Sequence, residues 1–380
     1  MDLKIFFSPI DEAVVKAAGD ATSFAAGIRF FVESQPEYRG QHMALIGLGG
    51  DGGEEELYCA AEAIRKKLYQ FKKGSGSYRI VDLGNLRPGI DRDETQLRLR
   101  EVCTALMEND VLPVLFGGGH DFTYGQYLAY EPLDKLVTLL NVDAEIDVNG
   151  PAPIGNHLHH ILMHEPNYLF SISHLAYQSY LVDVDTLRTF EKLYFETYRI
   201  GALRPNMADM EPVIRDADLM SFDLSAIRSS DAPGTGSPQP FGLSGEEACQ
   251  ICWYAGLNEK MSSAGIYGYH PAHDDVFEKT ASVAATMIWY FIEGYYHRKG
   301  ESSFRGNDYL RYVVSMQAEP AQMVFYKSKL SEKWWMEVPH PHSTFMYERN
   351  LIVPCSYSDY QSATRGEVPE RWIQHQAKLF

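Results

Sequence analysis

Hydrophobic and polar positions follow two alternating patterns along the first 300 residues. Hydrophobic residues spaced three and four positions apart predict helices at 54–72, 94–109 and 280–293. Strands buried on both faces that alternate with helices are typical of a parallel sheet covered on both sides. We therefore expect one doubly wound α/β domain over residues 1–300. Short, nearly continuous hydrophobic runs predict its strands, at 42–48, 78–83, 111–116, 136–142, 168–172, 196–200, 217–223 and 263–267.

The pattern changes after about residue 300. Two further strands are predicted at 323–329 and 333–338, and proline, histidine and aromatic residues follow them. We expect residues 301–380 to form an irregular extension that packs on the α/β domain. Its tryptophans and tyrosines would cover the core, or alternatively build an interface for assembly.

Composition and charge narrow the class of protein. The chain has 380 residues, of which 45% are hydrophobic and 22% charged, as in globular proteins. A net charge of −17 argues against binding to nucleic acid or to an anionic membrane. Five cysteines fit a reducing compartment, and the hydrophobic run at 281–292 is too short to span a bilayer. We expect a cytoplasmic protein.

Chemistry-bearing residues follow several of the predicted strands. His120 comes after three glycines, carboxylates stand at 143, 145 and 147, and Asp223 ends another strand. Ligands bind at the carboxyl ends of strands in an open parallel sheet, so these side chains are expected to meet. Clustered carboxylates repel one another unless a cation neutralises them. The pattern indicates a cation site, and solvated loops or capped turns are the alternative.

Five motifs together resemble the ureohydrolase superfamily, which contains arginase, agmatinase and formimidoylglutamase. The resemblance covers about residues 40–295 and implies an arginase-like α/β fold. It also implies two Mn²⁺ ions bridged by a hydroxide, which attacks a guanidino or formimino carbon. The motifs are GGGHD (117–121), DAEID (143–147), SFD (221–223), DAPGTG (231–236) and GLSGEE (242–247).

The resemblance implies a complete first metal site and an altered second one. By resemblance, the ligands of the first ion are His120, Asp143, Asp147 and Asp223, and all four are present. We therefore expect about one Mn²⁺ per chain, if the protein holds metal at all.

The second metal would need a histidine and an aspartate that this chain lacks. Glu145 stands where the family has the histidine, and Ser225 where it has the aspartate. A further family aspartate is Arg228 here. We expect Arg228 to pair with Glu145 and replace the second ion electrostatically, since an unpaired buried carboxylate is costly. The alternative is that Glu145 itself ligates a second ion.

Three other residues are candidates for binding or catalysis by resemblance. Glu247 matches the family's substrate-binding glutamate. His157 and His159 are near matches to its active-site histidine, although the register is off by about a residue. The alternative places both histidines at the surface or in a loop.

Two functions from different classes remain open. The first is a metal-dependent hydrolase of a C–N bond in a small amidine or guanidino substrate, formimidoylglutamase-like rather than arginase-like. The second is a metal-poor, non-catalytic relative that keeps the fold for binding or assembly. Members of the superfamily form oligomers, so a homo-oligomer is expected in either case.

Overall fold

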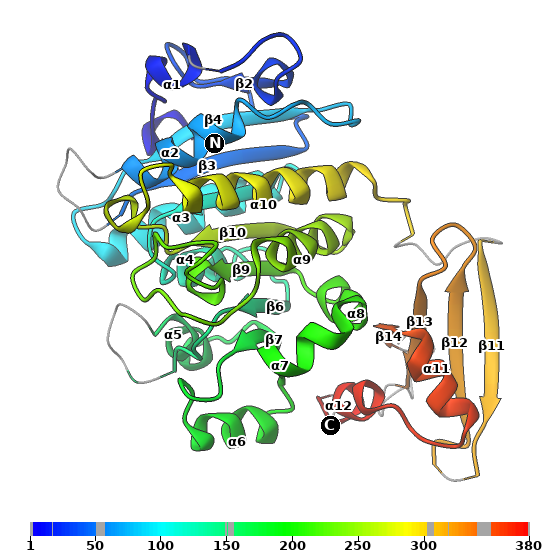
Figure 1. The fold of residues 1–380 in the computed structure, drawn as a ribbon. Coiled ribbons are helices and arrows are strands. Elements are labelled where there is room, and N and C mark those ends of the chain that lie inside the picture. Colours follow the sequence, from blue (N-terminus) through cyan, green and yellow to red (C-terminus); the bar gives the residue numbers. More distant parts are fainter. Residues whose placement is uncertain are drawn as a thin grey trace.

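A large twisted sheet runs through the α/β domain in the computed structural model of the protein (Figure 1). β1 is antiparallel to β4, and the other neighbouring strands run parallel. Their order is β1-β4-β3-β5-β10-β9-β6-β7-β8, with β2 paired to β4. The strands are β1 (Phe7–Ser8), β2 (Ile28–Phe30), β3 (Met43–Leu48), β4 (Ile80–Leu86), β5 (Leu112–Gly117), β6 (Val137–Val142), β7 (Leu169–Tyr177), β8 (Glu196–Arg199), β9 (Leu219–Asp223) and β10 (Ser263–Tyr267). The structure describes residues 3–16, 18–50, 58–148, 150, 156–301, 308–317, 319–339 and 351–378.

Helices cover both faces of this sheet. Along β3, Met43 and Leu45 belong to one hydrophobic core, while Ala44 and Ile46 belong to another. Side chains of a strand alternate between the two faces, so a strand that is hydrophobic throughout joins two cores. α2 (Cys59–Leu68), α8 (Glu211–Arg215), α9 (Gly245–Leu257) and α10 (Lys279–Tyr296) contribute to the first core, and α3 (Arg92–Met107) and α4 (Phe122–Leu128) pack on the opposite face.

The predicted fold class is confirmed, and the predicted strands match observed ones within a few residues at most ends. The helix predicted at 54–72 is α2, and its expected first residues, 54–57, lie outside the described residues. Several short helices carry too few turns to show a clear period in the sequence. They include α1 (Glu12–Lys16), α5 (His157–Met163), α6 (Val184–Lys192) and α7 (Ile200–Leu203).

The carboxyl ends of β5, β6 and β9 come together at one edge of the sheet. Val142 pairs with Phe222 across β6 and β9, and β10 joins β9 to β5 through Ile266. The loops that leave these strands therefore start close together. This register brings the candidate residues of three separate sequence motifs to one place.

The C-terminal extension is more regular than the sequence suggests. It forms an antiparallel sheet in the order β11-β12-β13-β14, which stands at the right of Figure 1. Phe325, Trp334 and Met336 lie in a separate hydrophobic core beneath it. Its elements are β11 (Tyr309–Ser315), β12 (Gln322–Ser328), β13 (Trp334–Val338), β14 (Leu351–Cys355), α11 (Tyr357–Thr364) and α12 (Glu370–Lys378).

A buried cluster of charges ties α12 to the amino ends of the large sheet. Arg371 Nη1 lies 2.8 Å from Glu196 Oε1, at the start of β8. His375 Nε2 lies 2.9 Å from Asp216 Oδ2, just before β9, and Lys260 Nζ lies 3.6 Å from Asp216 Oδ1. We call these five residues the attachment cluster. It lies at the opposite ends of the strands from the candidate site.

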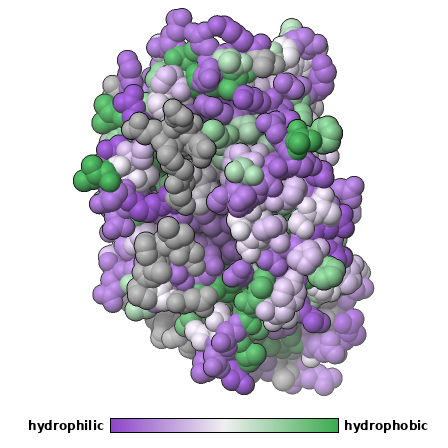
Figure 2. Space-filling model, turned by 60° about the vertical axis from the view of Figure 1, so that its left-hand side comes forward, coloured by the Kyte–Doolittle hydropathy of each residue, from purple (hydrophilic) through white to green (hydrophobic). Residues whose placement is uncertain are grey.

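The surface and the helices agree with the polar composition. On the face shown in Figure 2, hydrophilic residues predominate and hydrophobic residues form small separate groups. Within the described part of the chain, no helix has both the length and the hydrophobicity needed to cross a membrane.

Candidate metal centre

A glycine turn delivers His120 to the edge of the sheet. Gly118 has φ +66°, in the left-handed region that favours glycine. A Cβ on Gly118 would lie 2.7 Å from the Phe122 ring and 3.0 Å from Gly49 O. Only a residue without a side chain fits at this point of the turn. His120 lies just after the turn and just before α4, and it is 8% exposed.

The two ring nitrogens of His120 have different neighbours. Nε2 lies 2.8 Å from Ser221 Oγ, on β9. Nδ1 faces three carboxylates, at 3.0 Å from Asp143 Oδ2, 3.5 Å from Asp223 Oδ2 and 3.7 Å from Asp147 Oδ2. The structure thus brings together the four residues that the resemblance assigned to the first ion. We call them, with His157, the His120 cluster.

Ser225 orients two of these carboxylates. Its hydroxyl donates to Asp143 Oδ1 at 3.1 Å, and its backbone N–H donates to Asp223 Oδ1 at 2.6 Å. The Oδ2 atoms of both aspartates are then the ones that face His120. A Cβ on Gly268 would lie 2.7 Å from Asp223 Oδ2, so glycine at this position leaves room for the carboxylate.

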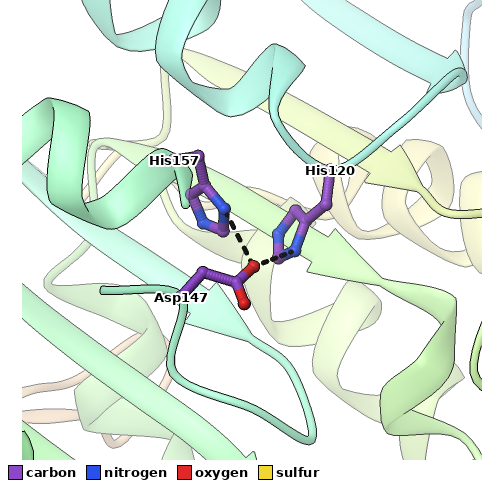
Figure 3. A group of neighbouring side chains, drawn as sticks. All are labelled: His120, Asp147 and His157. Atoms are coloured by element: carbon purple, nitrogen blue, oxygen red, sulfur yellow. Dashed lines mark ion pairs between the residues drawn. The ribbon is translucent and has the colours of Figure 1, made fainter. Parts of the chain in front are cut away.

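His157 joins the cluster from the first turn of α5. Its Nδ1 lies 3.2 Å from Asp147 Oδ2, and its ring centroid lies 4.0 Å from that of His120 (Figure 3). The side chain is completely buried, so the alternative of a surface position is wrong for His157. Among the residues that the structure describes, neither His120 Nδ1 nor His157 Nδ1 finds a hydrogen-bond partner of acceptable geometry.

The pKa values show how the charges of the cluster act on one another. Burial alone would lower the pKa of His120, but Asp143, Asp223 and Asp147 outweigh it and raise this pKa to about 9. Burial raises the pKa of Asp147 to about 6, and it also raises the pKa values of Asp143 and Asp223. Burial and the nearby charge of His120 lower the pKa of His157 well below its usual value.

The residues of the cluster fit a divalent cation. Among the described residues, no lysine or arginine forms an ion pair with Asp143, Asp147 or Asp223. Buried carboxylates without a compensating charge are costly, as are buried ring nitrogens without a partner. Two groups of potential ligand atoms are present, His120 with Asp143 and Asp223, and His120 with Asp147 and His157. Carboxylate oxygens with imidazole nitrogens suit an ion such as Mn²⁺.

The predicted pairing of Arg228 with Glu145 is wrong. Arg228 Nε lies 3.0 Å from Asp231 Oδ1, and its side chain is 44% exposed. Asp231 also accepts from the backbone N–H of Gly245, which holds it beside Arg228. Arg228 and Asp231 are three residues apart in one turn. They therefore meet more readily than Arg228 and Glu145, which follows another strand.

Glu145 lies beside the cluster without joining either group of ligand atoms. Its backbone N–H donates to Asp143 Oδ1 at 3.2 Å. Burial raises the pKa of its carboxyl, and the charges of Asp143, Asp147 and Asp223 add to the shift. As with the three aspartates, no lysine or arginine in the described ranges forms an ion pair with Glu145.

The remaining candidates have defined structural contacts. Glu247 forms a capping box with Ser244 at the start of α9, and its Oε1 accepts from Arg204 at 3.0 Å. Both of its oxygens are thus engaged. The backbone N–H of His159 donates to Asp147 O at 3.2 Å, and its side chain is half-buried.

Sequence reasoning assigned no role to two buried residues that adjoin the site. Asn141 Oδ1 lies 3.1 Å from His157 Nε2, and Asn141 Nδ2 lies 3.1 Å from His174 Nδ1. Both residues are fully buried in the hydrophobic strands β6 and β7. A polar residue inside an otherwise hydrophobic strand is the signal that could have identified them.

The family model and the similar proteins point to the same family. The family model "Arginase family" matches residues 41–293. A formimidoylglutamase of Staphylococcus haemolyticus is 28% identical over 224 residues, which cover 56% of this chain and 71% of that protein. The formimidoylglutamase of Rhodococcus jostii is 25% identical over 273 residues, covering 64% of this chain and 83% of the relative.

Solved structures agree with the fold. A formiminoglutamase of Trypanosoma cruzi with Mn²⁺ has a TM-score of 0.61 at 19% identity and covers 70% of this chain and 97% of its own. A formimidoylglutamase of Bacillus subtilis has a TM-score of 0.62 at 18% identity, covering 71% of this chain and 91% of its own. At such identities the likeness shows the fold alone. These four proteins are named formimidoylglutamase or formiminoglutamase, the activity that the sequence resemblance favoured over arginase.

Proposed function

Because the chain belongs to the arginase family, we propose that it hydrolyses a C–N bond of a linear amidine, with formimidoylglutamate as the substrate. The observation that carries the proposal is the His120 cluster, in which buried imidazole nitrogens meet three carboxylates that no described lysine or arginine balances. The names of the relatives support the choice of substrate, since those with significant sequence similarity include several formimidoylglutamases.

In this proposal, one Mn²⁺ per chain is held by His120 Nδ1 and by the carboxylates of Asp143, Asp147 and Asp223. When bound, such an ion supplies Lewis acidity, which makes water a nucleophile near neutral pH. The contact between His120 Nε2 and Ser221 Oγ keeps the Nδ1 atom directed at the carboxylates. The chain's own contribution is thus to present the ligand atoms in a fixed, largely buried arrangement.

Ser225 supports a site for one ion. The residue at this position would have to be an aspartate to ligate a second ion in the family pattern. Its hydroxyl and backbone N–H instead occupy Asp143 Oδ1 and Asp223 Oδ1. Ser225 therefore orients the ligands of the first ion, and the second ion loses that ligand.

The proposal is tested with purified protein dialysed against Mn²⁺ and offered formimidoylglutamate, agmatine, guanidinobutyrate and arginine. We expect formamide release from formimidoylglutamate that depends on Mn²⁺. Asp223→Asn should reduce it about 100-fold or more, because several kcal/mol of charge stabilisation are lost. The control is Asp185→Asn, whose carboxylate is 83% exposed. A protein that binds Mn²⁺ but releases no product from any substrate would favour the non-catalytic alternative.

Assembly and location stay predictions. A cytoplasmic homo-oligomer is the expectation from the family resemblance and from cysteine usage, and light scattering on the purified protein tests the assembly.

A further inference from the structure

We propose that His157 is a ligand of the ion in the His120 cluster, so that one ion is held by two imidazoles together with carboxylates. The inference rests on the proposed function only in requiring an ion beside His120. The family pattern places a second histidine ligand at the position of Glu145. In this chain, a histidine from α5 enters the same cluster by a different route.

The geometry brings both imidazoles to one carboxylate oxygen. His157 Nδ1 lies 3.2 Å from Asp147 Oδ2, and His120 Nδ1 lies 3.7 Å from the same atom (Figure 3). The three ligand atoms of this group lie within 4.8 Å of one another. Ligands that share an ion at about 2.1 Å, at right angles, are separated by about 3 Å, so the observed spacing suits a common ion.

A chain of buried hydrogen bonds fixes which nitrogen of His157 is free. His174 Nε2 lies 3.3 Å from Asp143 O, which can only accept, so His174 carries its proton on Nε2. His174 Nδ1 must then accept, and its neighbour is Asn141 Nδ2 at 3.1 Å. Asn141 Oδ1 is left to accept from His157 Nε2 at 3.1 Å.

The opposite assignment of donors and acceptors in this chain is excluded by the contact between His174 Nε2 and Asp143 O. If the amide of Asn141 were turned over, His174 would donate from Nδ1 and present a lone pair on Nε2 to Asp143 O. Two acceptors would then face each other in a fully buried place, which is costly. The amide orientation therefore follows from the network, as it must where oxygen and nitrogen are otherwise equivalent.

This direction gives His157 Nδ1 a lone pair aimed into the cluster. The atom is buried, has no hydrogen-bond partner within the described part of the chain, and lies 3.2 Å from a carboxylate oxygen that is an acceptor when ionised. Two acceptors at this distance repel each other unless a metal ion or a proton binds both. A histidine whose far nitrogen is fixed by a buried partner is also the usual arrangement of a metal ligand.

The first test measures Mn²⁺ content and affinity in the metal-depleted full-length protein, without any substrate. His157→Asn should weaken Mn²⁺ binding at least about 10-fold, because losing even a residue that only orients a ligand costs about 10- to 100-fold. His164→Asn is the matched control, because His164 caps the other end of α5 and contacts Tyr124, away from the cluster. It should bind Mn²⁺ as the unmodified protein does.

The second test needs no variant and so remains decisive if His157→Asn fails to fold. Pulsed electron paramagnetic resonance of Mn²⁺ in protein labelled with ¹⁵N-histidine counts the imidazole nitrogens coupled to the ion. Two coupled nitrogens support the inference. One coupled nitrogen, or equal Mn²⁺ affinity in His157→Asn, overturns the inference and leaves the proposed function intact. Failure of the unmodified protein to bind Mn²⁺ overturns both.

Discussion

The attachment cluster, apart from the exposed Lys260, and the His120 cluster are both largely buried and both contain carboxylates, yet their charges are balanced differently. In the attachment cluster, Arg371, His375 and Lys260 face Glu196 and Asp216. Burial alone would raise the pKa of Asp216, but the nearby cations outweigh it and lower this pKa. In the His120 cluster, by contrast, burial raises the pKa values of all three aspartates.

The difference separates a structural contact from a binding site. Carboxylates that meet cations of the same chain hold two parts of the protein together and need nothing from solution. The three aspartates of the His120 cluster meet no lysine or arginine among the described residues and share one imidazole, so part of their charge stays unbalanced; perturbed pKa values of this kind concentrate at functional sites.

The largest effect is expected from the attachment cluster. Arg371→Met would leave Glu196 and Asp216 without their arginine, and removing one partner of a buried pair costs about 3–5 kcal/mol. Urea unfolding followed by tryptophan fluorescence measures this loss. Arg365→Met is the control, because Arg365 is 60% exposed and should change the free energy of unfolding by less than about 0.5 kcal/mol. Equal losses of unfolding free energy in Arg371→Met and Arg365→Met would show that the buried arginine contributes no more than the exposed one.

A smaller effect of opposite sign is expected from Asp147→Asn in metal-free protein. The folded-state pKa of Asp147 is about 6, above its ordinary value of 3.8, so the folded protein loses stability as the pH rises between these values. At pH 8 the variant should therefore be more stable than the unmodified protein by about 1–3 kcal/mol. At pH 4 the two should be nearly equal.

Chemical unfolding in the presence of a chelator, at pH 4 and pH 8, measures this difference. Excess Mn²⁺ should reverse its sign at pH 8, because the unmodified protein then gains binding energy that the variant lacks. A variant that is less stable at pH 8 without metal would show that the carboxylate is already balanced by the chain.

The smallest effect is expected from Arg228→Gln. Arg228 is 44% exposed and its partner Asp231 23% exposed, and ion pairs near the surface contribute about 0–1 kcal/mol. Thermal unfolding should change little, and the Mn²⁺ content measured by mass spectrometry should stay the same. A loss of bound Mn²⁺ would show that Arg228 acts on the His120 cluster after all.

The sequence was sufficient for the sheet and for the meeting of the four residues assigned to the first ion. Buried strands such as β6 are largely hydrophobic, and His120, Asp143 and Asp223 stand at or just after carboxyl ends of strands. The resemblance adds Asp147, in the same motif as Asp143. Residues whose position is set by the end of a strand can therefore be predicted from the hydrophobic pattern of the sequence.

The sequence was insufficient where a contact is not set by the end of a strand. His157 stands ten residues after Asp147, and nothing in the local pattern shows that its ring meets that carboxylate. The partner of Arg228 was misjudged for the converse reason, since a local aspartate competed with a distant carboxylate. Likewise, the order of the C-terminal sheet depends on pairings between β13 and β14, which lie well apart in the sequence.

The position of β10 has a consequence for the synthesis of the chain on the ribosome. β10 lies between β5 and β9, yet residues 263–267 are translated after every other strand of the large sheet. Until they emerge, His120 belongs to one half-sheet and Asp143 and Asp223 to another, each with an unpaired edge open to wrong partners. An ion that requires both His120 and these aspartates would therefore bind only after β10 has joined the two halves. It can report that the last strand has been inserted.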